Sequence, residues 1–203
     1  MNNYFDKVYC VNLDKRVDRW TECLNEFQRH NITVERFSAL DGTLLDNSTT
    51  LLPGQLGCKL SHLSIIEQAK NNNLNSVVIL EDDVEFHQNF NVELDECMKH
   101  LTESWNMIFM GANHIQRPTR LNDRIYKLNY SYSAHCYAIH NSVYDLLIEL
   151  LKSSSEPLDV VYATLQSHIN AYVFNPHLAW QKPGYSDICE ESVDYTHVLK
   201  ISL

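Results

Sequence analysis

The chain has 203 residues, of which 44% are hydrophobic and 21% charged, and its formal net charge is −10. This length fits a single domain with a sizeable core. The acidic balance disfavours nucleic acid as a partner, because binding to nucleic acid relies on Lys and Arg to neutralise phosphates.

Neither the N-terminus nor any internal segment carries a membrane or export signal. The first seven residues lack the apolar core of a signal peptide, and no apolar run approaches the ~18 residues of a membrane span. We therefore expect a cytoplasmic protein without a membrane span. Peripheral contact with a membrane and the oligomeric state stay open.

The cysteines are scattered and form no Cys-x-x-Cys pair. They are Cys10, Cys23, Cys58, Cys97, Cys136 and Cys189. Reduced thiols are favoured over a disulfide framework, and zinc has little support from this spacing.

Apolar periodicity predicts alternating strands and helices in the first half of the chain. In chain order these are a strand at 7–13, a helix at about 17–30, a strand at 32–37, a helix around 60–70 and a strand at 76–80. The polar stretch Thr43–Gly57 is predicted as a loop. This alternation indicates parallel βαβ units with right-handed crossovers.

The second half has a mixed pattern that ends in a polar, less regular tail from Gln181. Strands are expected at 107–111, at 122–129 as a short edge strand, at 134–140 and at 171–174, and helices at about 91–101, 142–152 and 157–166. No Gly-x-Gly-x-x-Gly or Walker loop is present, so Rossmann dinucleotide binding and P-loop chemistry are disfavoured.

Three consecutive acids, Glu81, Asp82 and Asp83, directly follow the apolar run 77–80. A buried strand that delivers acids at its carboxyl end is how an open α/β sheet presents a ligand or metal site. Alternation along an extended segment turns Glu81 and Asp83 to one side and Asp82 to the other. Two acids on one side suit Mg²⁺ or Mn²⁺. The alternative is an acidic turn in solvent.

Two arginines mark the start of the first predicted helix. Arg16 and Arg19 are three residues apart and can share a face. Together with the helix N-terminus they can hold an anion. The alternative is a solvated face on which Arg19 pairs with Glu22.

Five further residues are candidates with strong structural alternatives. Gly57 and the Ser61-His62 pair lie before or at the start of the second predicted helix and can line a cleft or simply cap the helix. His177 follows a late strand and can complete a metal site, although a lone histidine is more often structural. Asp159 lies in the first turn of a predicted helix, where the helix dipole favours an acid, and it can also act as a general base.

Taken together, these segments resemble glycosyltransferase family 25, the lipooligosaccharide-type and collagen-type β-glycosyltransferases. The resemblance rests on four segments in register. They are Val11-Asn12-Leu13 with Arg16, Asp18 and Arg19; Ala39-Leu40-Asp41-Gly42; Gly57-Cys58-x-Leu60-Ser61-His62; and Val78-Ile79-Leu80-Glu81-Asp82-Asp83-Val84. Segments 134–138, 157–159, 176–181 and 186–187 agree more loosely.

The resemblance implies an α/β GT-A fold, a Rossmann-like nucleotide-binding mixed sheet flanked by helices. It implies a single domain over 1–203, with a nucleotide-sugar half at about 1–110 and an acceptor half at about 111–203. It also implies a UDP-sugar donor and inversion at the anomeric carbon. The sugar would be a hexose, galactose or glucose, and the acceptor a glycan, glycolipid such as lipopolysaccharide, or glycoprotein.

The resemblance and the residue patterns described above together give the expected roles. Donor binding falls to Asn12, Arg16, Arg19, Asp41, Gly42, Gly57, Ser61, His62 and Asp82. Glu81, Asp83 and His177 would hold Mn²⁺ or Mg²⁺, and Asp159 would be the catalytic base. Because Glu stands first in the family's Asp-x-Asp-like motif, the two acids that touch the metal stay open. The alternatives are a non-catalytic sugar-nucleotide-binding or scaffold protein and a metal-dependent phosphohydrolase.

Overall fold

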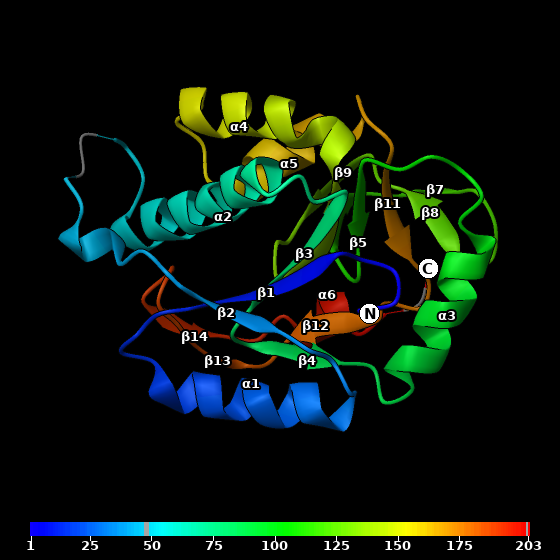
Figure 1. Ribbon diagram of the computed structural model, residues 1–203, viewed down its shortest axis with the longest axis horizontal. Coiled ribbons are helices and arrows are strands. Elements are labelled where there is room, and N and C mark those ends of the chain that lie inside the picture. The colour runs from blue at the N-terminus through cyan, green and yellow to red at the C-terminus, as the bar shows by residue number, and fades with distance from the viewer. Residues whose placement is uncertain (47–48, 202) are drawn as a thin grey trace.

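The computed structural model describes residues 1–46, 49–201 and 203. Its centre is an eight-stranded sheet (Figure 1). In sheet order the strands are β2 (Glu35–Ser38), β1 (Lys7–Asn12), β3 (Ser76–Glu81), β10 (Cys136–His140), β5 (Met107–Phe109), β11 (Ala171–Phe174), β8 (Ile125–Lys127) and β7 (Thr119–Arg120).

The sheet is parallel at one side and mixed at the other. Strands β2, β1 and β3 are parallel, whereas β10 is antiparallel to both of its neighbours, β3 and β5. Strand β11 is parallel to β5 and antiparallel to β8. The predicted parallel first half and mixed second half are therefore both confirmed.

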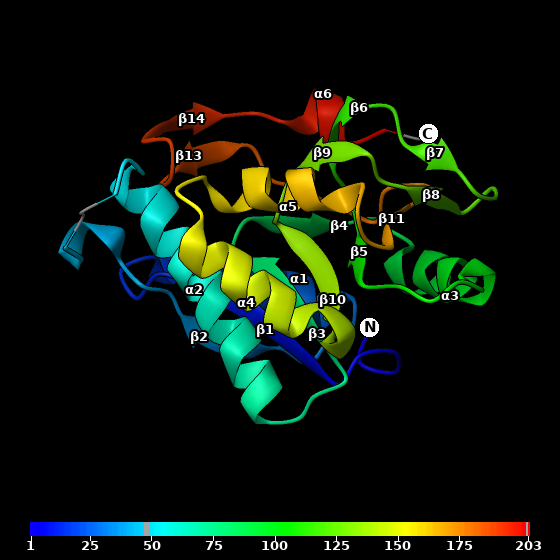
Figure 2. The same cartoon turned by 90° about the horizontal axis from the view of Figure 1, so that it is seen from above.

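Helices cover both faces of the sheet (Figure 1). They are α1 (Val17–Arg29), α2 (Pro53–Asn71), α3 (Phe90–His100), α4 (Tyr144–Ser153), α5 (Leu158–Gln166) and the short α6 (Thr196–Leu199). Figure 2 shows α2, α4 and α5 together over one face, and α1 and α3 pack on the other. The predicted fold class, α/β with a mixed sheet flanked by helices, is confirmed.

Alternation along β3 explains this two-sided packing. Val77 and Ile79 join the core under α2, α4 and α5, while Val78 and Leu80 join the core under α1 and α3. All four side chains are fully buried. Successive strand residues point to opposite faces, so a continuous apolar run is required where both faces are covered.

Short elements surround the end of the sheet at which β1 and β3 finish. They are the pairs β4 (Val84–Phe86) with β12 (Ala179–Gln181), β13 (Gly184–Ser186) with β14 (Glu191–Val193) and β6 (Asn113–Gln116) with β9 (Tyr130–Tyr132), and the 3-10 turn η1 (Gly42–Leu44). The other 3-10 turn, η2 (Asn141–Val143), follows β10 at the opposite end of the sheet, since His140 is in register with Ser76 at the start of β3. Because β12 pairs with β4, the C-terminal part of the chain returns to the segment that follows the three acids.

Three expectations about the elements were wrong. The loop predicted at 43–57 is shorter, because α2 already begins at Pro53; residues 47 and 48 lie outside the described part. Proline is favoured at the first helical position, where its fixed φ suits the helix. Because α2 begins at Pro53, Gly57 lies inside the helix and not before it. The edge strand expected at 122–129 is shortened to β8 and is covered by β7. The tail after Gln181 contains β13, β14 and α6.

Within the described ranges, none of the helices combines the length and the apolar character needed to cross a membrane.

Candidate functional site

The three acids lie where β1 and β3 end side by side. Val11 of β1 is in register with Glu81, the last residue of β3. Asp82 and Asp83 form the turn into β4. A crevice beyond the carboxyl ends of neighbouring strands is the usual ligand site of an open α/β sheet.

Asp82 and its two neighbours point in different directions. Asp82 accepts hydrogen bonds from Asn12 Nδ2 at 2.7 Å and from Arg19 Nη1 at 2.7 Å. Glu81 and Asp83 instead both face Gln181, whose Nε2 is 3.4 Å from Glu81 Oε2 and 3.5 Å from Asp83 Oδ2. The alternation expected from the extended segment is therefore present, with Glu81 and Asp83 on one side.

Burial makes this acid pair electrostatically costly. Desolvation, followed by repulsion from Asp83 and Asp82, raises the pKa of Glu81 to about 8. Desolvation also raises the pKa of Asp83, although Arg19, whose Nη1 is 3.6 Å away, partly offsets it. Partly buried like charges that share Gln181 as a neighbour need a proton or a cation to coexist.

One oxygen of the pair has no protein partner. Asp83 Oδ1 is buried and accepts no hydrogen bond from any described residue. An orphaned carboxylate oxygen next to a second acid fits a hard divalent cation, which prefers oxygen ligands. Glu81 and Asp83 are thus chemically suited to Mn²⁺ or Mg²⁺.

A cavity of about 260 Å³, here called the Arg19 cavity, opens beside the acids. Four of the residues expected to bind the donor line it together with all three acids. They are Arg19, Asp41, Gly42 and His62, with Glu81, Asp82 and Asp83. The structure therefore gathers residues that are up to 64 positions apart around a single hollow.

Four other expected donor residues support this cavity from behind or at its rim. Asn12, almost fully buried, holds Asp82 and accepts a hydrogen bond from Arg36 Nε at 2.9 Å. Ser61 Oγ donates to Gly57 O at 2.6 Å and accepts from Leu40 N–H at 2.8 Å, which fixes the wall near Asp41. At the rim, Arg16 forms ion pairs with two acids, Asp18 and Asp187.

Asp159 lies in a second cavity of about 460 Å³, here called the Asp159 cavity. The aromatic residues Tyr132 and Tyr195 also line it. Desolvation raises the pKa of Asp159, and its Oδ1 accepts from Val160 N–H at 2.9 Å. Glu81 and Gln181 line both cavities and therefore lie on the boundary between them, whereas Asp82 and Asp83 line the Arg19 cavity alone.

His177 is not brought to the acids, contrary to its expected metal role. It is 1% exposed, and its Nδ1 is 2.8 Å from Leu199 O while its Nε2 is 3.1 Å from His114 Nε2. It lines neither cavity. With both ring nitrogens engaged, His177 ties β6 to α6, which is a structural role.

Sequence reasoning missed several cavity residues on the C-terminal segment and on α2. Gln181 contacts acids about 100 positions earlier, and Tyr185 and Asp187 meet Arg19 and Arg16. No local signal identifies such long-range partners. For Cys58, one signal was available, namely its i,i+4 spacing to His62 on a helix.

A family model described as glycosyltransferase family 25 (LPS biosynthesis protein) matches residues 5–120, more than half of the chain. The chain belongs to this family. The matched region includes Arg19 and the three acids, while Asp159 and Gln181 lie beyond it.

Curated relatives of this family-25 chain carry two kinds of name. Inactive glycosyltransferase 25 family member 3 of Mus musculus is 30% identical over 133 residues, which are 55% of this chain and 22% of the relative. Procollagen galactosyltransferase 2 of Mus musculus is 28% identical over 162 residues (66% and 26%), and procollagen galactosyltransferase 1 of Danio rerio is 30% identical over 162 residues (66% and 27%). The chain spans about a quarter of the length of these relatives.

Proposed function

We propose that this family-25 chain is an inverting glycosyltransferase that moves a hexose from a UDP-sugar to an acceptor hydroxyl with the help of Mn²⁺ or Mg²⁺. The observation that carries the proposal is the position of Glu81 on the wall that the two cavities share, with Asp83 beside it in the Arg19 cavity. One cavity presents Arg19 and the other presents Asp159. A transferase needs such a boundary, where the donor meets the acceptor.

On the donor side, the chain supplies cations and backbone for a diphosphate. Arg19 and Lys15 line the Arg19 cavity, and the charge of their side chains suits phosphate oxygens. Glu81 and Asp83 would hold the divalent cation, which neutralises charge that develops on the leaving diphosphate. Asp41 and Gly42 would contact the nucleoside.

On the acceptor side, Asp159 would remove the proton from the attacking hydroxyl. Burial raises its pKa, and a general base works best when its pKa approaches the working pH. Attack from the Asp159 cavity, opposite a leaving group in the Arg19 cavity, would invert the anomeric carbon. The aromatic faces of Tyr132 and Tyr195 suit a glycan acceptor, whether free, on a lipid or on a protein.

The decisive experiment is a thermal-shift titration with UDP-glucose, UDP-galactose and GDP-mannose, each with and without Mn²⁺. We expect a UDP-hexose with Mn²⁺ to raise the melting temperature in a concentration-dependent way, because a ligand specific for the native state stabilises it. GDP-mannose is the nucleotide control. Absence of any shift with every UDP-hexose would overturn the donor assignment.

A non-catalytic binder is the second candidate, since several relatives are named inactive. A degenerate copy more often loses its acids, and here all three are present. UDP release measured with and without a mixture of simple glycosides separates the two. A transferase produces a glycosylated acceptor by mass spectrometry, a binder shows only the thermal shift, and a phosphohydrolase releases inorganic phosphate.

A further inference from the structure

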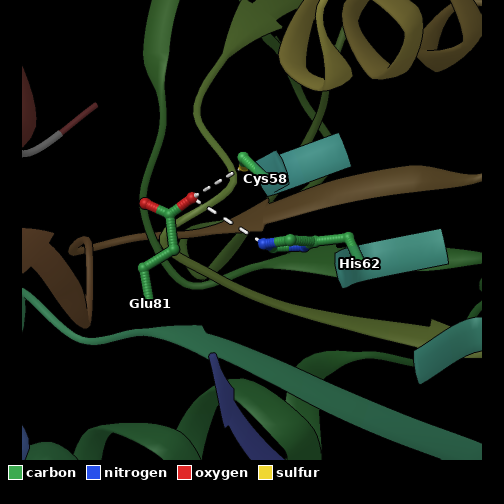
Figure 3. Close-up of side chains that lie close together, drawn as sticks. All are labelled: Cys58, His62 and Glu81. Atoms are coloured by element: carbon green, nitrogen blue, oxygen red, sulfur yellow. Dashed lines mark hydrogen bonds and ion pairs between the residues drawn. The ribbon is translucent and has the colours of Figure 1, made fainter. Parts of the chain in front are cut away.

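Three side chains of different chemistry meet behind the acids. Cys58 and His62, one turn apart on α2, both face the carboxylate of Glu81 at the end of β3 (Figure 3). Glu81 Oε1 is 3.8 Å from Cys58 Sγ and 3.8 Å from His62 Nε2. The three candidate ligand atoms all lie within 4.8 Å of one another.

His62 gives this cluster an unsatisfied group. Its side chain is 0% exposed, and its Nε2 has no hydrogen-bond partner among the described residues. Burial lowers the pKa of His62 to about 3, so the ring is neutral and its contact with Glu81 is no ion pair. A buried, unpartnered nitrogen aimed at a thiol and a carboxylate requires an explanation.

The far side of the imidazole is held in place. His62 Nδ1 lies 2.7 Å from the hydroxyl of Tyr137, which lies 3.1 Å from the hydroxyl of Tyr162. With its proton on Nδ1, His62 donates to Tyr137 and turns the Nε2 lone pair toward Glu81. Partners of this kind orient metal-binding histidines in known sites.

The donor set and its spacing suit a tetrahedral metal of the zinc type. Thiolate, imidazole and carboxylate are all zinc ligands, and bonds of about 2.0–2.3 Å put neighbouring ligand atoms roughly 3.4–3.6 Å apart. The observed 3.8 Å contacts are close to that spacing. Cys58 and Glu81 line both cavities, so a fourth position would face open space.

We propose that Cys58, His62 and Glu81 form a zinc-type site with one open coordination position, distinct from the hard-cation site of Glu81 and Asp83. The two sites share Glu81 through different oxygens, since Oε1 faces Cys58 and His62 while Oε2 faces Gln181. Metal binding releases the thiol proton of Cys58 to solvent, so affinity rises with pH. The site needs no sugar nucleotide and stands independently of the transferase proposal.

Cobalt provides the test, because Co²⁺ replaces Zn²⁺ and reports its ligands by colour. Chelator-stripped full-length protein is titrated with Co²⁺ and then with Zn²⁺. We expect about one equivalent to produce intense tetrahedral visible bands and a near-ultraviolet thiolate-to-cobalt band, both removed by Zn²⁺ and retained in excess Mg²⁺. Absence of the thiolate band in the wild type would overturn the proposal.

Matched variants locate the site. Cys58→Ser, nearly isosteric at a partly buried position, should lose the thiolate band and weaken zinc binding at least about tenfold. Cys189→Ser, at an exposed thiol, should leave both unchanged. Asp83→Asn should keep the cobalt spectrum while weakening Mn²⁺ binding. A band that survives in Cys58→Ser, or vanishes in Cys189→Ser, would overturn the assignment.

Discussion

At the scale of single residues, partial burial of Glu81 and Asp83 opposes their ionisation in the folded chain. Glu81 and Asp83 are desolvated and repel each other, and Arg19 offsets only part of that cost. Strain of this kind, kept at one place in an otherwise well-packed core, is typical of a functional site.

Asp83→Asn should abolish sugar transfer without lowering the melting temperature. The amide keeps the shape of the side chain but removes one of the buried charges that a cation would hold. Transfer to an acceptor and thermal unfolding would be measured on the same preparation. Asp145→Asn, at an exposed carboxylate on α4, is the control and should leave transfer unchanged. Full transfer by Asp83→Asn would contradict the hard-cation assignment.

Asp159→Asn should lower kcat by about 10²- to 10⁴-fold, the usual worth of general-base catalysis. The affinity for UDP should hardly change, because Asp159 lies in the other cavity. Steady-state kinetics and UDP titration check both parts. Glu156→Gln, an exposed neighbour, serves as the control. A large loss of UDP affinity with unchanged kcat would place Asp159 on the donor side instead.

At the scale of elements, the C-terminal segment covers the Arg19 cavity. Tyr185 O accepts from Arg19 Nη2 at 2.5 Å, and Asp187 pairs with Arg16. The backbone of Asp187 and Ile188 passes so close to Gly54 that an added Cβ would lie 2.5 Å from Asp187 O. The carboxylate of Asp187 is thus paired with Arg16, a residue that is expected to bind the donor.

Asp187→Asn should loosen this cover and strengthen UDP binding. Loss of the ion pair leaves Arg16 paired with Asp18 alone and removes a negative charge from the rim. We expect an effect of about two- to fivefold for a partly exposed pair. Calorimetric titration with UDP and limited proteolysis at residues 184–193 provide the measurements. Glu191→Gln, on the same hairpin, is the control. Unchanged proteolysis and affinity would show that the pair does not hold the segment.

Gly57→Ala should destabilise the protein although alanine is the better helix former. The new Cβ would lie 2.4 Å from Leu40 O and 2.7 Å from Gly42 N. Such overpacking costs about 1–3 kcal/mol, more than the ~1 kcal/mol gained in helix propensity. The melting temperature of Gly57→Ala should be several degrees lower than that of the wild type. The control Gly184→Ala, which has open space around the added Cβ, should keep the wild-type melting temperature. Equal melting temperatures would mean that η1 can move away from α2.

The local pattern of apolar residues predicted a strand or helix well where it followed a single period, that of a strand or that of a helix. The apolar run 171–174 is β11 at the expected bounds, because only a strand of that length fits between polar neighbours. The start of α2 was missed because Pro53-Gly54 is typical of turns, and only the helix that follows shows that Pro53 is its first residue.

At the scale of the whole molecule, buried histidines couple stability to pH. His62, His135 and His177 are at most 1% exposed, and burial lowers their pKa values to about 3, 4 and 4 from an ordinary value of 6.5. Below pH 6.5 the unfolded chain takes up protons that the folded chain refuses. The stability that these three histidines contribute is therefore full above about pH 6.5 and is lost as the pH falls toward 4.

His177→Gln should flatten this acid dependence. Each buried histidine contributes at most about 1.4 kcal/mol per pH unit to the loss, so removing one should reduce the slope of unfolding free energy between pH 6.5 and 4.5. Urea unfolding across that range gives the slope. His168→Gln, at an exposed position, is the control and should keep the wild-type slope. An unchanged slope in His177→Gln would mean that other groups govern acid unfolding.

Only the part of the candidate site that follows β3 directly in sequence was predictable. An apolar strand that ends in acids revealed Glu81 and Asp83, because strand and acids are adjacent in sequence. Gln181 is about 100 positions from them, and it reaches them only because β12 pairs with β4. His177 was misassigned for the same reason, since its partners on β6 and α6 are distant in sequence.

The place of β10 in the sheet has a consequence for protein engineering. The segment that carries the family signature, 5–120, includes β3 and β5 but not β10, which lies between them. Cut out alone, that segment would leave β3 without β10 at one edge and β5 without either of its neighbours, β10 and β11. Bare strand edges of this kind promote aggregation. Residues 5–120 therefore identify the family but do not form a unit that can be moved alone into another protein. A chimera must exchange the whole sheet.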